Sequence, residues 1–455
     1  MKLTIIGGGS VRTPRLIPSL VRRAARLGLQ ELWLMDSEPK RLELIGGMCR
    51  RQVEQLGGRF RVFTSGDAQV AIMDASHVIT SIRPGLETSR AADERIAFGL
   101  GVLGQETTGA AGFAMAMRSA PAILEYAGLV ESLAAPGAWL FNFTNPAGLV
   151  AQVLHDAGMK RVVGICDSAN KARNEVSHFL GIPQGRLRHD VYGLNHLSWT
   201  RSVRIDEGED EPGEELLPAL LGDERFVQAT HLKMFAPGLR AEEKVFLNEY
   251  LHYFYHRDEA LTQLLQEKET RGEQVQRLTR QLLRKLRAAS DVDGQLAIWQ
   301  DVMARRSKSY MAHARDGADR KQRNPVGEDD EGYAAVALGC VEAIARDQPA
   351  WTGLNVPNGS AIAGMDADDV VEVSCRVDGR GPVPTPIGDI PDRHLALMRS
   401  VKVYERLASR AILQRSRSLA VQALCAHPLV GSWPLAEKLF DAFYQAHRDI
   451  VGTWR

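Results

Sequence analysis

The chain begins MKLTIIGGGS, residues 1 to 10, and this stretch decides the fold. A short apolar run, Leu3 to Ile6, leads directly into Gly7, Gly8 and Gly9, and Ser10 precedes a segment with a helical pattern. Glycines let the backbone turn tightly and approach a pyrophosphate, and the N-terminus of the next helix faces that anion. The pattern predicts a dinucleotide-binding βαβ unit with its phosphate loop at Gly7 to Ser10.

A second apolar run, Leu32 to Met35, ends at Asp36. A carboxylate at this place can accept hydrogen bonds from the ribose hydroxyls of NAD. The glycine spacing is GGGS and not GxGxxG, so the motif alone also fits a glycine-rich turn of another α/β protein. The preceding strand and Asp36 favour NAD as the cofactor.

Composition and charge narrow the class of protein. The 455 residues suffice for two or three domains, and Lys+Arg and Asp+Glu both number 56. Zero net charge argues against a general nucleic-acid or anionic-membrane binder, and no apolar run reaches the length of a membrane span. Five scattered cysteines without a CxxC pair indicate a reducing compartment. We therefore expect a cytoplasmic protein without a secretory signal.

Strands and helices alternate in the first part of the chain. Apolar runs bounded by turn residues predict further strands at 78–82, 139–143 and 162–166, and a helix is expected over 120–133. This alternation predicts an α/β fold, with a Rossmann-type, doubly wound parallel sheet over residues 1–195. Ligands of such sheets lie beyond the carboxyl ends of the strands. The loops Gly7 to Ser10, Asn142 to Pro146 and Cys166 to Ser168 therefore matter most.

The second half, residues 196–455, is predicted to be a mixed α+β domain for catalysis, substrate binding and oligomerisation. Its expected parts are an acidic solvated loop over 206–215, a helical pattern over 263–286, a polar loop over 315–332, strands and turns over 356–377, and helices to the C-terminus.

Two residues suggest a metal site. Cys166 ends a predicted strand, and His196 follows Asn195 in GLNHLSW. A thiolate and an imidazole with nearby carboxamides can hold a divalent metal. A buried cysteine and a hydrogen-bonded histidine beside a capping Asn195 fit the same residues.

Other polar motifs have two readings each. Glu106 lies in QETTG, for which a polar loop is the simpler interpretation. Tyr250 lies in NEYLHYFY, for which a helix with aromatic core positions is the simpler interpretation. Arg90 and Arg271 are candidate anion ligands, although solvated helix faces fit them equally well.

Taken together and in order, the motifs resemble the NAD- and metal-dependent family 4 glycoside hydrolases, most closely the 6-phospho-β-glucosidase members. The resemblance covers nearly the whole chain and rests on GGGSVRTP, SRAADERI, GVLGQETTGAAGF, NFTNPAG, GICDS, GLNHLSW, NEYLHYFY, ETRGEQV, VPNGSAIAGMDADDVVEVSC and ALCAHPLV. This family is an exception to the two-carboxylate mechanism of glycoside hydrolysis.

The resemblance implies roles for residues of this chain. It implies Cys166 and His196 as ligands of a metal, usually manganese, and Tyr250 as the catalytic base. It implies Asp167 as general acid and Glu106 as the residue that raises the basicity of the tyrosine. The sugar-phosphate positions that it implies are Arg90, Asn145, Asn195 and Arg271.

The chain departs from the family pattern at three places. Ser168 to Asn170 replaces a proline soon after the cysteine, Gly109 to Gly112 replaces GPGG, and Asp329 to Gly332 replaces an Arg-Gly-Gly stretch. These differences bear on substrate preference more than on the chemistry.

The implied reaction is transient oxidation at sugar carbon 3, proton abstraction at carbon 2, elimination of the aglycone and addition of water. The expected substrate is a phosphorylated disaccharide or glycoside, and the expected assembly is a homodimer or homotetramer. Three alternatives stay open at this point: a 6-phospho-α-glucosidase or an unphosphorylated α-glucosidase or galactosidase of the family, an NAD-dependent hydroxy-acid dehydrogenase, and a non-catalytic NAD sensor.

Overall fold

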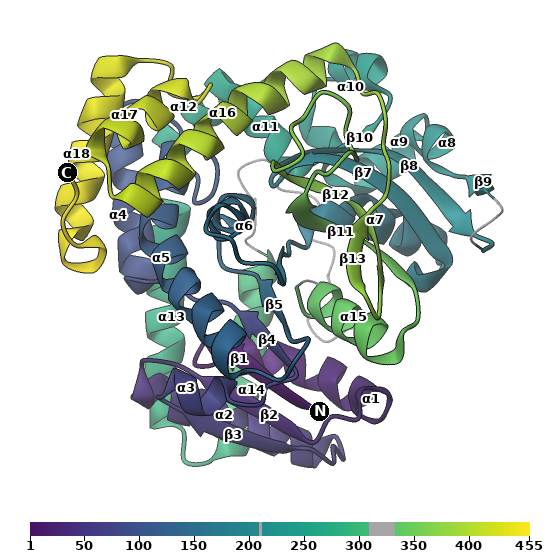
Figure 1. Cartoon of the computed structure of the whole chain (residues 1–455), viewed down its shortest axis with the longest axis vertical. Helices are drawn as coiled ribbons and strands as arrows, with labels where there is room; N and C mark the ends of the chain where they lie inside the picture. Colours follow the sequence, from purple (N-terminus) through teal and green to yellow (C-terminus); the bar gives the residue numbers. More distant parts are fainter. Residues whose placement is uncertain (209–211, 309–332) are drawn as a thin grey trace.

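The computed structural model describes residues 1–208, 212–308 and 333–455 (Figure 1). Within these ranges the main sheet has nine strands, in the order β13-β12-β11-β6-β5-β4-β1-β2-β3. The first-half strands are β1 (Lys2–Ile6), β2 (Glu31–Met35), β3 (Arg61–Ser65), β4 (His77–Thr80), β5 (Trp139–Asn142) and β6 (Val162–Gly164). All are parallel, and their order 3-2-1-4-5-6 is that of a dinucleotide-binding sheet. The predicted fold class is confirmed.

Burial explains why these short runs form central strands. Leu3, Ile5 and Ile6 of β1 are at most 1% exposed, and even Thr4 between them is fully buried. A strand covered on both faces needs a continuous apolar run, which is typical of parallel sheets.

The helices of the first half are α1 (Leu16–Leu27), α2 (Pro39–Gln55), α3 (Ala68–Ile72), α4 (Leu86–Gly99), α5 (Ala110–Leu133), α6 (Ala147–Asp156) and α7 (Lys171–Leu180). Of these, α2, α3, α5 and α6 pack against strands of the main sheet. Helix α5 starts ten residues before the predicted Ala120. Its first turns are rich in alanine and buried, and Gly112 lies within this packed helix.

Three strands from the second half extend the main sheet beyond β6. They are β11 (Ala350–Pro357), β12 (Val370–Asp378) and β13 (Gly381–Pro384), and all run antiparallel to their neighbours. Helix α15 (Tyr333–Arg346) packs against α1 and β12. The two halves of the chain therefore share one sheet.

A second, antiparallel sheet contains β7 (Leu187–Leu194), β8 (Leu197–Asp206), β9 (Pro212–Glu215) and β10 (Phe246–Leu247). In Figure 1 this sheet lies at the upper right, with α6 between it and the C-terminal helices. The solvated loop predicted over 206–215 is wrong at its end, because β9 pairs with β8 there.

Helices complete the second half: α8 (Leu217–Leu221), α9 (Glu224–Ala229), α10 (Pro237–Glu243), α11 (His252–Tyr255), α12 (Arg257–Gln266), α13 (Arg271–Ala288), α14 (Val292–Lys308), α16 (Asp392–Gln414), α17 (Arg417–Ala426) and α18 (Trp433–Val451). The predicted helical stretch 263–286 is interrupted, because Thr270 caps a new helix at Arg271 through a capping box with Glu273. The C-terminal helices are confirmed, and the polar loop predicted over 315–332 lies outside the described residues. None of the described helices is long and apolar enough to span a bilayer.

Candidate active site

The predicted site segments meet at one edge of the main sheet. Gly7 follows β1, Asn145 comes three residues after β5, and Cys166 comes two residues after β6. Because these strands are parallel neighbours of one sheet, their carboxyl ends lie together. The prediction that these three loops form one site agrees with the topology.

Cys166 and His196 are in contact. His196 lies in the two-residue turn between β7 and β8 and has a positive φ of 63°. This turn carries its Nε2 to 3.3 Å from the Cys166 Sγ, and both residues are at most 5% exposed. A soft thiol and an imidazole from separate elements thus face each other, as the proposed metal site requires.

Hydrogen bonds fix the tautomer of His196. The Thr107 hydroxyl donates to Gln105 Oε1 at 2.9 Å, so its single proton is engaged. His196 Nδ1 lies 2.6 Å from the same hydroxyl oxygen and must therefore donate to it. The proton of the neutral ring is then on Nδ1, and Nε2 presents a lone pair towards Cys166. Such an outer partner orients and tunes a metal-binding histidine.

Burial controls the protonation of both groups. It lowers the pKa of His196 to about 4, so the imidazole is neutral at neutral pH. Burial, with the charges of Asp167 and Glu372, also raises the pKa of the Cys166 thiol well above its usual range. A divalent cation would reverse that effect, because metal binding drives thiol deprotonation.

The protein supplies few ligands at this place. Among the described residues, no group of three His, Cys, Asp or Glu side chains is arranged to hold a metal. An ion held by Cys166 and His196 would keep most of its coordination positions open to substrate or water, as a catalytic site requires.

Tyr250 lies directly on the histidine. It belongs to a short 3-10 turn, Glu249–Leu251, whose N-cap Asn248 accepts a hydrogen bond from the Tyr250 N–H at 3.0 Å. The phenol ring stacks on the His196 imidazole, with ring centroids 3.7 Å apart. Tyr253, in contrast, is buried and packs in a small apolar cluster with Leu103 and Leu429, as the aromatic-core interpretation predicts.

Asp167 is exposed next to the buried Cys166, and its Oδ1 lies 3.8 Å from the cysteine Sγ. An exposed carboxyl beside the pair can exchange protons with solvent and with a bound group. The position fits the general-acid role that the resemblance implies.

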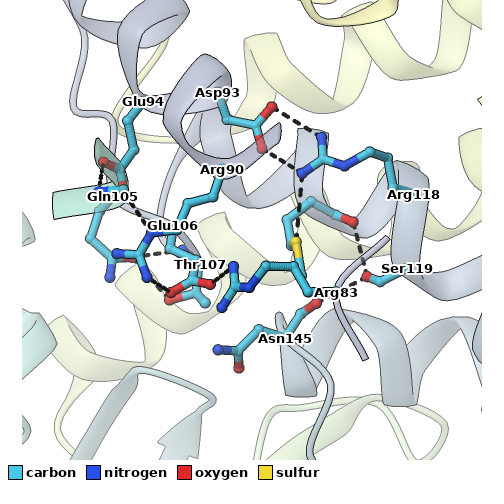
Figure 2. Close-up of polar contacts among 12 residues, drawn as sticks. Arg83, Arg90, Asp93, Glu94, Gln105, Glu106, Thr107, Arg118, Ser119 and Asn145 are labelled. Atoms are coloured by element: carbon cyan, nitrogen blue, oxygen red, sulfur yellow. Dashed lines mark hydrogen bonds and ion pairs between the residues drawn. The ribbon is translucent and has the colours of Figure 1, made fainter. Parts of the chain in front are cut away.

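Glu106 is held by two arginines (Figure 2). Its carboxylate forms ion pairs with Arg83 and, at 2.6 Å, with Arg90. Burial alone would raise the pKa of Glu106, but the two guanidinium charges outweigh it and lower the pKa to about 2. Tyr250 is among the groups whose charge acts on Arg90, so Arg90 connects Glu106 to the tyrosine electrostatically.

The helix that begins at Arg271, α13, contacts the same cluster through its second residue, Gly272. Arg90 Nε donates to Glu94 Oε1 at 2.8 Å, and Glu94 Oε2 accepts from the Gly272 N–H at 2.6 Å. A Cβ at Gly272 would lie 2.9 Å from that carboxylate oxygen, so glycine allows the close approach. The N-terminus of α13, where Arg271 is the first residue, is thereby fixed beside Arg90.

The two predicted asparagines differ in their surroundings. The Asn145 side chain lies near Arg83 in Figure 2, and its backbone carbonyl accepts from Ser119 Oγ. The Asn195 carboxamide is engaged at both ends, by the Gly148 N–H at 3.4 Å and by Glu372 at 3.1 Å. Asn195 is therefore part of the scaffold that holds the turn of His196.

The glycine loop is tightly packed. The Gly7 and Gly8 N–H groups both donate to the Met35 carbonyl, and the Gly9 N–H donates to Asp36 Oδ2 at 2.9 Å. A Cβ at Gly8 would lie 2.7 Å from the Leu34 Cβ, so this glycine is needed for packing against β2. Burial raises the pKa of Asp36 despite these hydrogen bonds. Ser10 Oγ accepts from the Arg12 N–H, which continues the loop.

Three site residues escaped the sequence reasoning. Arg83 follows β4, and its only signal was its place after a predicted strand. Thr107 lies in the quoted QETTG motif, but nothing in that motif indicates a partner 89 residues away. Glu372 lies in the apolar strand β12, where burial raises its pKa to about 7.

Comparisons with known proteins identify the family of the chain. Residues 2–182 match the model of the family 4 glycosyl hydrolases, and residues 191–430 match that of the family 4 glycosyl hydrolase C-terminal domain. A "Probable 6-phospho-beta-glucosidase" of Bacillus subtilis is 31% identical over 98% of this chain and 96% of its own. The 6-phospho-beta-glucosidase of Escherichia coli is 30% identical over 98% and 95%.

A solved structure shows the same fold. The 6-phospho-beta glucosidase of Thermotoga maritima with manganese, NAD+ and glucose-6-phosphate is 25% identical. The match covers 99% of this chain and 98% of that one, with a TM-score of 0.82. The chain belongs to the family 4 glycosyl hydrolases.

Proposed function

We propose that the protein is an NAD- and divalent-metal-dependent 6-phospho-β-glucosidase. One observation carries the proposal: Cys166, His196 and Tyr250 form a contiguous stack beside the carboxyl edge of the nucleotide-binding sheet. A metal-binding pair next to a phenol base, and not two facing carboxylates, suits an elimination that begins with oxidation. The names and bound sugar phosphates of the relatives support the substrate class.

When bound, NAD takes a hydride from sugar carbon 3 and later returns it, and a divalent cation polarises the carbonyl that results. Cys166 and His196 would hold that cation. A sulfur and nitrogen pair is soft for manganese, so the choice of manganese rests on the relatives.

The remaining steps belong to side chains of this chain. Tyr250 removes the proton from carbon 2, which the neighbouring carbonyl makes acidic. A phenol has a pKa near ~10 and needs a nearby cation to act as a base at neutral pH. Arg90 is such a cation, and Glu106 holds it in place. Asp167 protonates the departing oxygen, and water then adds to the product of elimination.

Arg271, Arg90 and Asn145 are proposed to bind the substrate, whereas Asn195 is proposed to support the turn of His196, because Gly148 and Glu372 hold its carboxamide. Arg90 already forms ion pairs with two carboxylates, and their negative charges weaken its electrostatic attraction for a phosphate dianion. Arg271 is the first residue of α13, but Glu94 and the Thr270 cap already bind the N–H groups at this helix terminus, so the proposal for Arg271 rests on its guanidinium charge and not on the helix dipole.

We propose that the two parts of the chain have different roles. Residues 1–195 bind NAD, and residues 196–455 supply the base, one metal ligand and the contacts of a homodimer or homotetramer. All five cysteines are free thiols, which supports a cytoplasmic location because Cys166 must stay reduced. Light scattering of the purified protein would give the oligomer size.

The test is hydrolysis of cellobiose-6′-phosphate by purified protein with NAD+ and Mn²⁺. We expect glucose-6-phosphate to form only when both are present, and without accumulation of NADH. Net NADH formation from a hydroxy acid without added metal would support a dehydrogenase instead. Faster hydrolysis of maltose-6′-phosphate would assign the α-glucosidase activity of other relatives.

A further inference from the structure

Glu372 is a fully buried carboxylate in the middle of β12. Its Oε2 accepts from the Ser198 hydroxyl at 2.7 Å, and its Oε1 accepts from the amides of Asn195 at 3.1 Å and Asn355 at 3.4 Å. Among the residues that the structure describes, no Lys or Arg forms an ion pair with it. Three neutral donors therefore stabilise this buried group.

Such an arrangement is costly for the fold. Burying a carboxylate without a cation carries a desolvation penalty that hydrogen bonds only partly offset, and an apolar residue would suit a central strand better. Stability alone does not account for a glutamate here. The function of its hydrogen-bond partners supplies a reason.

One arm of the network holds the turn of His196. Asn195 precedes the histidine, and its amide donates to Glu372 while its Oδ1 accepts from the Gly148 N–H of α6. The two contacts fix the carboxamide at both ends. The turn that presents Nε2 to Cys166 is thereby tied to β12 and α6.

The other arm reaches Tyr250. The Ser198 oxygen that donates its proton to Glu372 accepts from Asn248 Nδ2 at 3.0 Å. Asn248 Oδ1 in turn accepts from the Tyr250 N–H at 3.0 Å. The Asn248 N–H also donates to the Ser198 carbonyl. The segment that carries the tyrosine is thus tied to the same carboxylate.

We propose that Glu372 is a positioning residue that fixes His196 and Tyr250 relative to each other. It acts on the histidine through Asn195 and on the tyrosine through Ser198 and Asn248. The inference rests on the proposed function, in which the histidine holds a metal and the tyrosine removes a proton. The hydrogen bonds of Glu372 go to Asn195, Ser198 and Asn355, so it positions His196 and Tyr250 through these partners, and its charge also raises the pKa of the Cys166 thiol.

The test compares Glu372→Gln with Asp369→Asn. Glutamine keeps the shape of the side chain but turns one accepting oxygen into a donor that faces other donors. Asp369 is a matched control, because it is a buried carboxylate that directly precedes β12. It forms a bidentate ion pair with Arg406, away from the site. Mn²⁺ binding to the NAD-loaded full chain is followed by the loss of the free-ion electron paramagnetic resonance signal, alongside kcat, KM and melting temperature.

We expect Glu372→Gln to weaken Mn²⁺ binding and lower kcat, each by about 10- to 100-fold, as other outer-shell changes do. NAD affinity should stay within about twofold of wild type. Asp369→Asn should lower the melting temperature and leave Mn²⁺ binding and kcat unchanged. A Glu372→Gln protein with wild-type Mn²⁺ affinity and kcat would overturn the inference.

Ser198→Ala keeps the inference testable if Glu372→Gln does not fold. This variant cuts only the arm to Tyr250, so kcat should fall while Mn²⁺ binding stays close to wild type. An unchanged kcat in folded Ser198→Ala would contradict the role of Glu372. The proposed function itself fails if the wild-type chain binds no Mn²⁺ and cleaves no phosphoglucoside. The inference about Glu372 fails if the wild type is active and the variants behave in the same way.

Discussion

The imidazole of His196 and the phenol ring of Tyr250 lie face to face, with centroids 3.7 Å apart and planes 5° from parallel. This stack joins two elements that are far apart in the sequence, the β7–β8 turn and the segment before α11. It places the phenol ring of the tyrosine directly against the residue proposed to hold the metal. The base and the polarising ion would then act on neighbouring carbons of one sugar.

Tyr250→Phe should abolish most turnover without disturbing the stack, because only the hydroxyl is removed. Loss of a general base typically costs about 10²- to 10⁴-fold in rate. Binding of NAD and Mn²⁺ should match wild type, measured by calorimetry and by the Mn²⁺ resonance signal.

An independent readout of the same step uses heavy water. Wild-type turnover should place deuterium at carbon 2 of the product, detected by NMR, since the bond to that hydrogen is broken and remade. Product without deuterium would rule out an elimination that exchanges with solvent. A fully active Tyr250→Phe would remove the tyrosine from the role of base.

Cys166→Ser should remove activity at micromolar Mn²⁺ and leave the fold and NAD binding intact. A serine hydroxyl has nearly the same size but does not ionise as a thiol does next to a cation. Cys425→Ser, on the partly exposed side of α17, controls for the loss of a thiol and should behave as wild type. Full activity of Cys166→Ser after treatment with a chelator would contradict the metal role.

The sequence was sufficient for five of the six parallel strands of the main sheet and for the residues next to them, but not for β3 or for the addition of β11, β12 and β13 to this sheet. Leu3 to Ile6 and the glycines after it carry a local signal, because buried parallel strands and tight turns each require particular residue types. Helix α5 was predicted too short at its N-terminus, where buried alanines and Gly112 continue the helix back to Ala110. A local pattern indicates only what a segment can form by itself, and the start of α5 depends on packing against the rest of the protein.

The contacts that assemble the site were not predictable from local pattern. Glu372 lies 174 residues from Ser198, and Thr107 lies 89 residues from His196. The resemblance to the family identified the residues that touch substrate and metal. It did not identify their supports, because a serine, a threonine or a buried glutamate in an apolar strand has no distinctive spacing.

Gly8→Ala should impair both folding and NAD binding. The added methyl would lie 2.7 Å from the Leu34 Cβ, closer than packing allows, so the loop must move away from β2. Gly47→Ala in α2 is the control, since nothing lies within 4 Å of its added Cβ, and a helix-interior alanine is worth roughly 0.5–1 kcal/mol over glycine. We expect a lower melting temperature and weaker NAD binding for Gly8→Ala only; wild-type NAD affinity in that variant would contradict the loop assignment.

His77 should make stability depend on pH. Its Nδ1 accepts from the Trp139 N–H, and burial lowers its pKa to about 4 from an ordinary value of 6.5. The unfolded chain therefore binds the proton more readily, and stability is lost as the pH falls from about 6.5 to about 4, by up to roughly 3 kcal/mol. His77→Asn keeps an acceptor at the same position without titrating.

Urea unfolding at several pH values checks this expectation. The loss of unfolding free energy on acidification should be smaller in His77→Asn than in wild type. Equal slopes for wild type and His77→Asn would show that this histidine does not contribute.

Thr107→Val should weaken metal binding by freeing the ring of His196. The hydroxyl that accepts the Nδ1 proton is replaced by a methyl of similar size, so neither tautomer is selected and the buried Nδ1–H loses its partner. Changes of this kind typically cost about 10- to 100-fold in metal affinity.

Thr108→Val is a matched control, because the buried Thr108 hydroxyl has no hydrogen-bond partner among the described residues. We expect Thr107→Val to raise the Mn²⁺ dissociation constant and Thr108→Val to leave it unchanged, with NAD binding equal in both. Nitrogen-15 NMR of the imidazole would show the wild-type ring protonated at Nδ1 and the Thr107→Val ring as a mixture of tautomers. If wild type itself carried its proton on Nε2, the thiol of Cys166 would face a donor, and the role assigned to Thr107 would be lost.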